Sequence, residues 1–425
     1  MQKTISVKLG GIKISIETIV EGKTTSAIIV PNKKSAKVKF KETFLALPPV
    51  SKSSYYIPFG KNISGENVHA KFTSFPHFLV AGTSGSGKSV YVNSVITTLI
   101  MRNTPEQLRL ILIDPKRIEF SIYKDIPHLL CPVITDTNLA SPTIKKLVAE
   151  MERRYLLLEM SGCSDIEEFN EYAEEVGIQK VPTILAVLDE FGNLVEDDKT
   201  ISEHILKLAA KARAAAIHLL IATQRPSVNV ITGTIKANLD TRVCLSVSSS
   251  QDSQVVLDKG GAENLCGNGD MLVSCTKLTR NGFVRAQGCL IEKSEIRRVC
   301  EFLRKNNTLE YDPTFVNVKP EVKETKPADI PTLSLQEQRS KSDDELYNQI
   351  KSDVMCQEYT SMSRIQREYN IGFNRAGKMM NRLVQEGIVA PPDSQSSSKG
   401  SRVLKRHSDD GNHAGPGSIE SSEVN

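Results

Sequence analysis

Residues 82–89, with the sequence GTSGSGKS, constrain the possible fold more than any other stretch, because they match every fixed position of the phosphate-loop pattern GxxxxGK[ST]. The apolar run 78–81 predicts a buried strand before them, and the apolar spacing over 90–100 predicts a helix after them. In such a unit, the backbone N–H groups of the loop and the N-terminus of the helix bind phosphate. The motif therefore predicts a binding site for a nucleoside triphosphate, ATP. The residues of this predicted site are Gly82, Thr83, Ser84, Gly85, Ser86, Gly87, Lys88 and Ser89.

An acidic pair after a second apolar run supplies the predicted chemistry. Residues 183–188 read TILAVL, which is typical of a central parallel strand, and Asp189 and Glu190 follow at once. We expect Lys88 to reach the terminal phosphates and Ser89 to ligate Mg²⁺, with Asp189 holding the ion through water or through the Ser89 hydroxyl. Glu190 is predicted to orient and deprotonate the attacking water, which would make the chain a hydrolase.

Two further apolar runs, 108–113 and 217–222, predict neighbouring strands. Gln224 follows the second run and is the candidate γ-phosphate sensor, with Thr223 as the alternative. Gln224 could instead have a purely structural role and cap the turn before Pro226. Helical spacing over 138–160 and 203–216 alternates with the strands. This order predicts an α/β fold with a parallel sheet.

The cysteines and the apolar segments narrow the class of protein. All eight cysteines stand alone, which argues against a zinc ribbon or a disulfide framework and fits reduced thiols in the cytoplasm. No run approaches the ~20 apolar residues that cross a bilayer, and no signal peptide pattern is present. The net charge of +4 is too small to identify a partner.

Composition divides the chain into five parts. Alternating apolar and polar positions predict a small β-rich N-terminal module over 1–50, and the P-loop ATPase domain is predicted over 51–305. Residues 306–342 contain four prolines among polar residues and are predicted to be a linker. A compact domain is predicted over 343–405, followed by a disordered tail over 406–425.

The compact domain has the pattern of a winged helix. Apolar spacing predicts one helix around 346–354, a second capped by Ser361 and a third over 374–386, with strands of a wing at 387–389 and 402–404. Between 361 and 406, nine Lys and Arg residues face three acidic ones. The third helix therefore predicts DNA binding, with a solvated face on a protein-binding module as the alternative. The candidate DNA-binding residues are Asn374, Arg375, Lys378 and Arg382.

With these motifs the chain resembles the FtsK/SpoIIIE family of hexameric double-stranded DNA translocases. The resemblance covers roughly 50–300 and 343–405. It rests on the phosphate loop and on long strings that include IDPK at 113–116, MERRY at 151–155, KARAAAIH at 211–218, ATQRPSV at 222–228 and YNIGFNRA at 369–376.

The resemblance implies a RecA-like domain that forms a homohexameric ring around duplex DNA. It assigns Arg213 as an arginine finger that reaches the nucleotide of the neighbouring subunit, with Arg242 as second candidate and a salt bridge as the alternative for either. Because this chain lacks the membrane segment of membrane-bound members, the ring is expected to use a partner as its anchor or to work free in the cytoplasm; a recombinase is another possible partner. Lys378 and Asn381 depart from the family pattern, which leaves the recognised DNA sequence open.

The sequence thus predicts an ATP-driven motor that moves along double-stranded DNA, with the winged helix orienting or loading it. The biological purpose could be chromosome segregation, transfer of a genetic element or packaging. Two alternatives remain: an ATP-switched DNA-binding regulator, and a coupling ATPase of conjugation. Stimulation of hydrolysis by duplex or by single-stranded DNA distinguishes the three.

Overall fold

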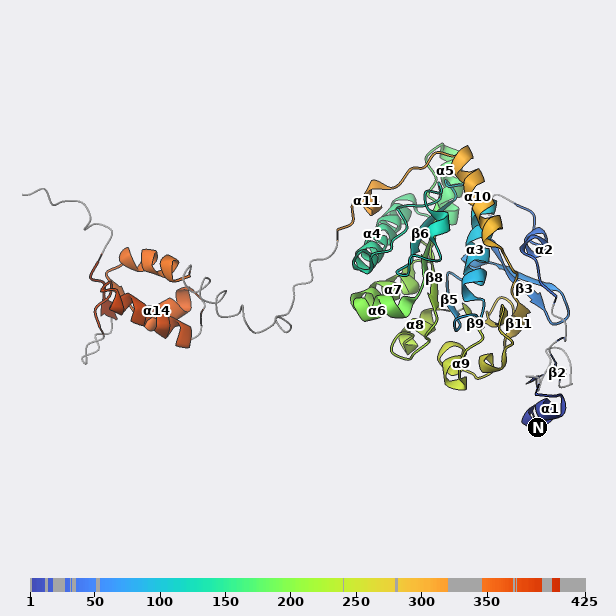
Figure 1. Ribbon diagram of the computed structural model, residues 1–425. Coiled ribbons are helices and arrows are strands. Elements are labelled where there is room, and N and C mark those ends of the chain that lie inside the picture. Colours follow the sequence, from blue (N-terminus) through green and yellow to red (C-terminus); the bar gives the residue numbers. More distant parts are fainter. Residues whose placement is uncertain are drawn as a thin grey trace, which may run out of the picture. The chain divides into compact units, whose positions relative to one another are not determined.

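The computed structural model describes residues 2–11, 14–17, 27–30, 32, 36–50, 54–239, 241–279, 282–319, 346–369, 371, 373–391 and 400–405. The chain divides into two compact units, residues 1–322 and 323–425, which are described separately (Figure 1). The predicted tail 406–425 and the predicted linker beyond residue 319 lie outside the described residues.

A nine-stranded mixed sheet forms the centre of the first unit, in the order β4-β3-β11-β10-β9-β5-β8-β7-β6. The strands from β9 to β6 run parallel, and those from β4 to β9 alternate in direction. Their bounds are β3 Tyr56–Asn62, β4 Asn67–Lys71, β5 His77–Ala81, β6 Leu108–Ile113, β7 Thr183–Leu188, β8 Ile217–Thr223, β9 Thr241–Leu245, β10 Asp270–Ser274 and β11 Val284–Gln287.

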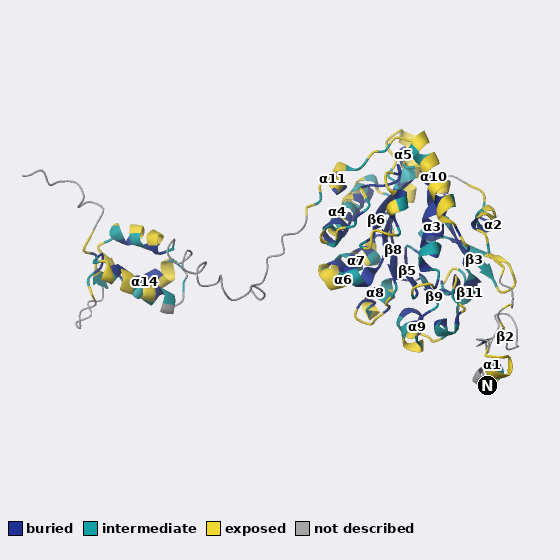
Figure 2. Ribbon diagram, viewed as in Figure 1, coloured by how far each residue is buried: buried dark blue, intermediate teal, exposed yellow. Residues whose placement is uncertain are grey.

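Helices cover both faces of this sheet, so the strands β5, β7 and β8 are buried along their whole length (Figure 2). Side chains alternate between the faces: Phe78 and Val80 join the core beneath α3 and α10, whereas Leu79 and Ala81 join the core beneath α4, α6 and α7. The two cores explain why these strands are continuous apolar runs in the sequence. The helices named here are α3 Lys88–Arg102, α4 Thr137–Ser161, α6 Phe191–Asp197, α7 Thr200–Lys211 and α10 Lys293–Asn306.

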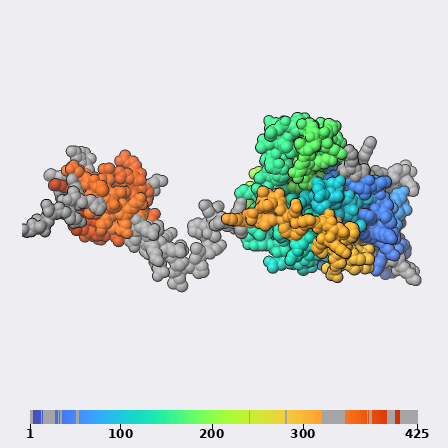
Figure 3. All heavy atoms as spheres, turned by 90° about the horizontal axis from the view of Figure 1, so that it is seen from above, coloured from blue at the N-terminus to red at the C-terminus, as the bar shows by residue number. Residues whose placement is uncertain are grey.

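Among its described residues the first unit also has several shorter helices: α1 Gln2–Lys8, α2 Phe40–Leu45, α8 Gly233–Asn238, α9 Ser250–Leu257 and α11 Pro313–Val316. Helix α5, Ile166–Val176, follows α4 and starts from the side-chain cap of Asp165. The orange helices α10 and α11 lie on the surface of the unit (Figure 3). None of the helices among the described residues is long and apolar enough to cross a membrane.

The predicted helix over 203–216 ends earlier than expected. Helix α7 stops at Lys211, and residues 212–216 form a turn that leads into β8, with Ala216 at a φ of 50°. Alanine favours helix, but tertiary contacts decide here. Other segments hold this turn in place: the carbonyl groups of Ala214 and Ala215 accept hydrogen bonds from Ile166 N and Arg154 Nη1, at 2.9 and 2.8 Å.

The N-terminal stretch 1–50 contains a two-stranded antiparallel sheet, β1 Ser15–Glu17 with β2 Ala27–Ile29. It also contains the helices α1 and α2, which the alternating pattern did not predict. Helix α2 packs on the first unit, because Phe40 is buried and its N–H donates to the carbonyl of Leu290 at 3.1 Å.

The second unit has the three helices expected from its sequence: residues 346–355, α13 Met362–Glu368 and α14 Phe373–Gln385. The Ser361 side chain caps α13 by accepting from the N–H of Arg364. In the wing, Val389 forms a bridge with Val403, while β13 Ser401–Arg402 pairs with β12 Tyr359–Thr360. The core of this unit includes Tyr347, Ile350, Val354, Ile365, Ala376 and Leu383.

Candidate nucleotide site

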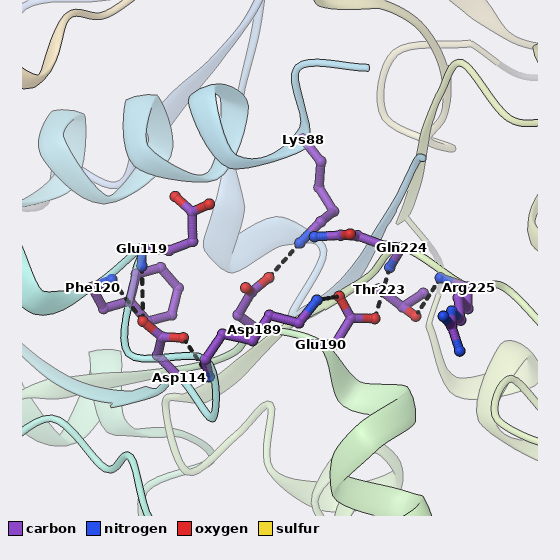
Figure 4. Close-up of polar contacts among 10 residues, drawn as sticks. Lys88, Asp114, Glu119, Phe120, Asp189, Glu190, Thr223, Gln224 and Arg225 are labelled. Atoms are coloured by element: carbon purple, nitrogen blue, oxygen red, sulfur yellow. Dashed lines mark hydrogen bonds and ion pairs between the residues drawn. The ribbon is translucent and has the colours of Figure 1, made fainter. Parts of the chain in front are cut away.

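The order of the parallel strands brings the predicted site residues to one edge of the sheet. Strand β8 lies between β5, which leads into the phosphate loop, and β7, which leads into Asp189. Strand β6 is next to β7 and leads into Asp114. Because these four strands run in the same direction, their C-terminal ends carry the loop, Gln224, the acidic pair and Asp114 side by side (Figure 4).

The phosphate loop has the backbone geometry that the motif requires. Gly85 and Gly87 have φ angles of 78° and 100°, which side chains other than glycine rarely adopt. A Cβ atom on Gly87 would lie 2.6 Å from the backbone nitrogen of Gly269, so the neighbouring loop leaves no room for one. That loop also fixes the motif, because Gly269 N donates to the carbonyl of Ser86 at 2.7 Å. The neighbouring loop at Gly269 therefore helps to fix the backbone of the phosphate loop directly before α3.

Lys88 and Asp189 form a buried ion pair at the entrance of this loop (Figure 4). Their side chains are 2% and 4% exposed, so the pair is almost completely removed from water. The other carboxylate oxygen of Asp189, Oδ2, is buried and has no hydrogen-bond partner among the described residues. Ser89 lies in the first turn of α3 and is half-buried. A free carboxylate oxygen and a nearby hydroxyl are ligands that suit Mg²⁺.

Glu190 is held on both of its carboxylate oxygens. Oε2 accepts from Lys116 Nζ at 3.0 Å, and Oε1 accepts from the backbone N–H of Gln224 at 3.2 Å. The backbone of Glu190 has a φ of 49°, a left-handed conformation that costs of order 1 kcal/mol in a residue with a side chain. Such strain is typical of functional positions. The residue is the N-cap of α6, and its side chain is 3% exposed.

Lys116 was not among the predicted site residues, although its string IDPK contributed to the resemblance. The position of Lys116 follows from Asp114, which is fully buried and accepts three backbone N–H groups of its own loop. These are the N–H groups of Lys116 at 3.1 Å, Glu119 at 2.9 Å and Phe120 at 3.0 Å. An acid followed by a lysine, directly after a strand at this edge, was the signal in the sequence.

The side chains of Gln224 and Thr223 differ in what they contact. Thr223 is buried, and its hydroxyl accepts from the N–H of Arg225 at 3.2 Å, so Thr223 caps the turn before Pro226. The side chain of Gln224 points toward Lys88 (Figure 4). This arrangement favours Gln224 over Thr223 as the residue that meets a bound phosphate.

Arg213 lies at the opposite edge of the sheet. It is exposed in the turn before β8, which spans seven residues, so it is roughly 20 Å from the edge that holds the loop. There it lines a cleft of about 1020 Å³. Arg242, in contrast, is engaged within its own chain: it pairs with Asp258 and donates to the carbonyl of Lys236 at 3.0 Å.

The four candidate DNA-binding residues are in or at the start of α14, but they differ in surroundings. Lys378 is exposed and Arg375 is half-buried. Arg382 lies over the ring of Tyr347, 4.0 Å from its centroid, and pairs with Glu386 at 3.4 Å. The side chain of Asn374 lies outside the described residues. Lys378 and Arg382 are thus both exposed, but Arg382 is engaged by Tyr347 and Glu386 within its own unit.

The fold and the nucleotide site define a P-loop protein of the RecA-like α/β class. Residues 49–228 match the profile of the FtsK/SpoIIIE family, and residues 341–401 match that of the Ftsk gamma domain. The chain therefore belongs to the FtsK/SpoIIIE family, as the resemblance predicted.

Curated relatives agree with this assignment. The chain is 39% identical over 395 residues to the DNA translocase SpoIIIE of Bacillus subtilis, an alignment that covers 91% of this chain and 48% of that protein. It is also 39% identical over 397 residues to the DNA translocase FtsK of Campylobacter jejuni, covering 93% of this chain and 41% of the relative. The chain thus spans about half the length, or less, of these curated relatives.

Solved structures support the fold. The conjugation coupling protein TcpA of pCW3, in a monomer form with ATPγS, matches with a TM-score of 0.55 and 26% identity, over 71% of this chain and 84% of that one. The cytoplasmic domain of the type VII secretion ATPase EccC of Thermomonospora curvata matches with a TM-score of 0.57 and 22% identity, over 65% of this chain and 36% of that one. The second similarity concerns the fold alone.

Proposed function

We propose that this chain is an ATP-driven motor that moves along double-stranded DNA in the cytoplasm. The observation that carries the proposal is the buried contact of Lys88 with Asp189, next to Glu190, at the mouth of a glycine-rich loop. This arrangement has the parts that phosphoryl transfer to water requires. The gamma domain in the same chain supports DNA as the track.

Each residue of the site has a part in the proposed hydrolysis. The backbone N–H groups of residues 82–89 cradle the phosphates of ATP, and Lys88 moves from Asp189 to the terminal phosphates. Ser89 and Asp189 would hold Mg²⁺, which would offset phosphate charge. Glu190 orients the attacking water and takes its proton, and Gln224 contacts the γ-phosphate.

The position of Arg213 supports a homohexameric ring. Since Arg213 lies roughly 20 Å from the nucleotide edge of its own sheet, it cannot reach its own ATP without a large rearrangement. In a head-to-tail ring it can reach the ATP of a neighbour and stabilise the charge of the transition state there. Hydrolysis then depends on assembly of the ring.

The second unit is proposed to orient or load the motor on duplex DNA. In a winged helix the recognition helix enters the major groove, which assigns that role to α14 and its cations Arg375 and Lys378. We propose a recombinase or a membrane anchor as a further partner of the chain. The proposed biological purpose of the motor is chromosome segregation or transfer of a genetic element.

A second candidate, a coupling ATPase of conjugation, is favoured by one observation: the similarity to the conjugation coupling protein TcpA. Steady-state ATP hydrolysis with linear duplex or single-stranded DNA separates the candidates. We expect strong stimulation by duplex that disappears in Lys88→Ala. Stimulation by single strands alone would support coupling, and hydrolysis indifferent to DNA would contradict the motor and leave a nucleotide-switched DNA-binding protein.

A further inference from the structure

The site places two lysines on two neighbouring carboxylates. Lys88 contacts Asp189, and Lys116 contacts Glu190 at 3.0 Å. Both carboxylates belong to side chains that are at most 4% exposed. Two buried negative charges on adjacent residues repel each other, and each needs a positive partner to stay where it is.

Lys88 cannot neutralise this pair throughout the reaction. The lysine of a phosphate loop binds the terminal phosphates, so nucleotide binding withdraws Lys88 from Asp189. Mg²⁺ would then compensate Asp189. Glu190 is not a predicted metal ligand, and its partner Lys116 comes from a loop that does not belong to the phosphate-binding motif, so nucleotide binding makes no direct demand on this contact.

The loop of Lys116 is built to present this side chain. Three backbone N–H groups converge on the fully buried carboxylate of Asp114, and one of them belongs to Lys116 itself. Hydrogen bonds to a charged acceptor are the stronger kind, so they fix the loop against β6. In parallel register, Ile113 lies opposite Leu188, which brings the residues after the two strands together. Lys116 therefore reaches Glu190 from a fixed starting point.

We propose that Lys116 is a positioning residue for ATP hydrolysis: it holds the buried carboxylate of Glu190 in the orientation from which it acts on the attacking water. This inference rests on the proposed role of Glu190 as the base. Lys116 acts through Glu190 and does not touch the nucleotide. It lowers the barrier of the chemical step and leaves ATP binding unchanged.

The test compares Lys116→Met with wild type in the full chain, using duplex-stimulated hydrolysis and binding of a fluorescent ATP analogue. Loss of one charge-assisted hydrogen bond predicts a kcat lower by about 10- to 100-fold, with KM and nucleotide affinity within about two-fold. Lys116→Arg keeps the charge and is expected to recover a large part of kcat. Lys124→Met, which removes an exposed lysine further along the same loop, is expected to behave as wild type.

A double-mutant cycle with Glu190→Gln shows whether Lys116 acts through Glu190. The glutamine lacks the charge that Lys116 holds, so adding Lys116→Met to it should change kcat by no more than about two-fold. An unchanged kcat in Lys116→Met, a defect confined to KM, or the same loss in both backgrounds would overturn the inference. Wild-type hydrolysis in Glu190→Gln alone would instead contradict the proposed base, so the two failures are distinguishable.

Discussion

Two histidines in the middle of the sheet are buried without charge. His77 in β5 accepts from the N–H of Leu219 at 3.2 Å, and His218 in β8 contacts the carbonyl of Pro76 at 3.0 Å. Burial lowers the pKa of His218 to about 4 and that of His77 to about 3, with smaller contributions from Arg154 and Arg213 near His218 and from His218 near His77. The neighbouring strands that carry the site therefore depend on neutral imidazoles.

The pH dependence of stability follows from the sign of these shifts. Because the folded pKa values lie below the unfolded value of about 6.5, the stability that the neutral rings contribute is present above that pH and is lost as the pH falls toward 4. We expect His218 alone to remove about 2 kcal/mol of the free energy of unfolding between pH 7.5 and 5.0. Urea unfolding at both pH values, followed by circular dichroism, measures this change.

The matched variant is His218→Asn, whose amide can still donate to the carbonyl of Pro76 but does not titrate. Its stability is expected to change less between pH 7.5 and 5.0 than that of wild type. An identical change in both proteins would show that other groups, such as carboxylates, set the acid sensitivity.

At the scale of elements, helix α14 carries one cation that we expect to bind DNA and another that we expect to stabilise the C-terminal unit. Both Lys378 and Arg382 are exposed, but Arg382 also lies over Tyr347 and pairs with Glu386. We expect Lys378→Ala to weaken duplex binding by the full chain and to reduce the salt dependence of the binding constant by about one charge. Arg382→Ala should mainly lower the unfolding midpoint of the C-terminal unit. Equal loss of DNA affinity in both variants, without loss of stability, would contradict this division.

Four of the five parallel strands, β5, β6, β7 and β8, could be predicted from the sequence, whereas the fifth, β9, and the antiparallel strands could not. The run 108–113 coincides with β6, because a strand buried on both faces is a continuous apolar segment. The antiparallel strands β3, β4, β10 and β11 are only partly buried. The addition of β3 and β4 to the sheet depends on a long-range pairing of Ala286 in β11 with Asn62 in β3. Local patterns carry little information about such a pairing.

The candidate site shows the same limit. Lys88, Asp189 and Glu190 follow from two motifs with defined contexts, whereas the contact of Lys116 with Glu190 depends on β6 lying next to β7. The strand order is a property of the whole domain. Lys116 could therefore be noticed in the sequence, but its partner could not be identified there.

At the scale of the whole molecule, the account requires sites shared between subunits. Lys88→Ala and Arg213→Ala chains should each be inactive in ATP hydrolysis. When they are mixed, some interfaces combine the intact loop of one chain with the intact Arg213 of the other, so activity should reappear. Mixing Lys88→Ala with Glu190→Gln is the control, since both variants damage the same edge of the sheet and no interface is restored. No recovery in the first mixture would argue against a finger supplied by the neighbour.

The central claim is movement along duplex DNA, and displacement of a third strand from a linear duplex measures it most directly. The full chain with ATP should release a triplex-forming oligonucleotide placed far from the loading end. Release should be absent with ATPγS and in Lys88→Ala, although both still bind the duplex. If wild type binds the duplex and hydrolyses ATP at a stimulated rate yet leaves the third strand in place, the protein is not a translocase and the account is contradicted.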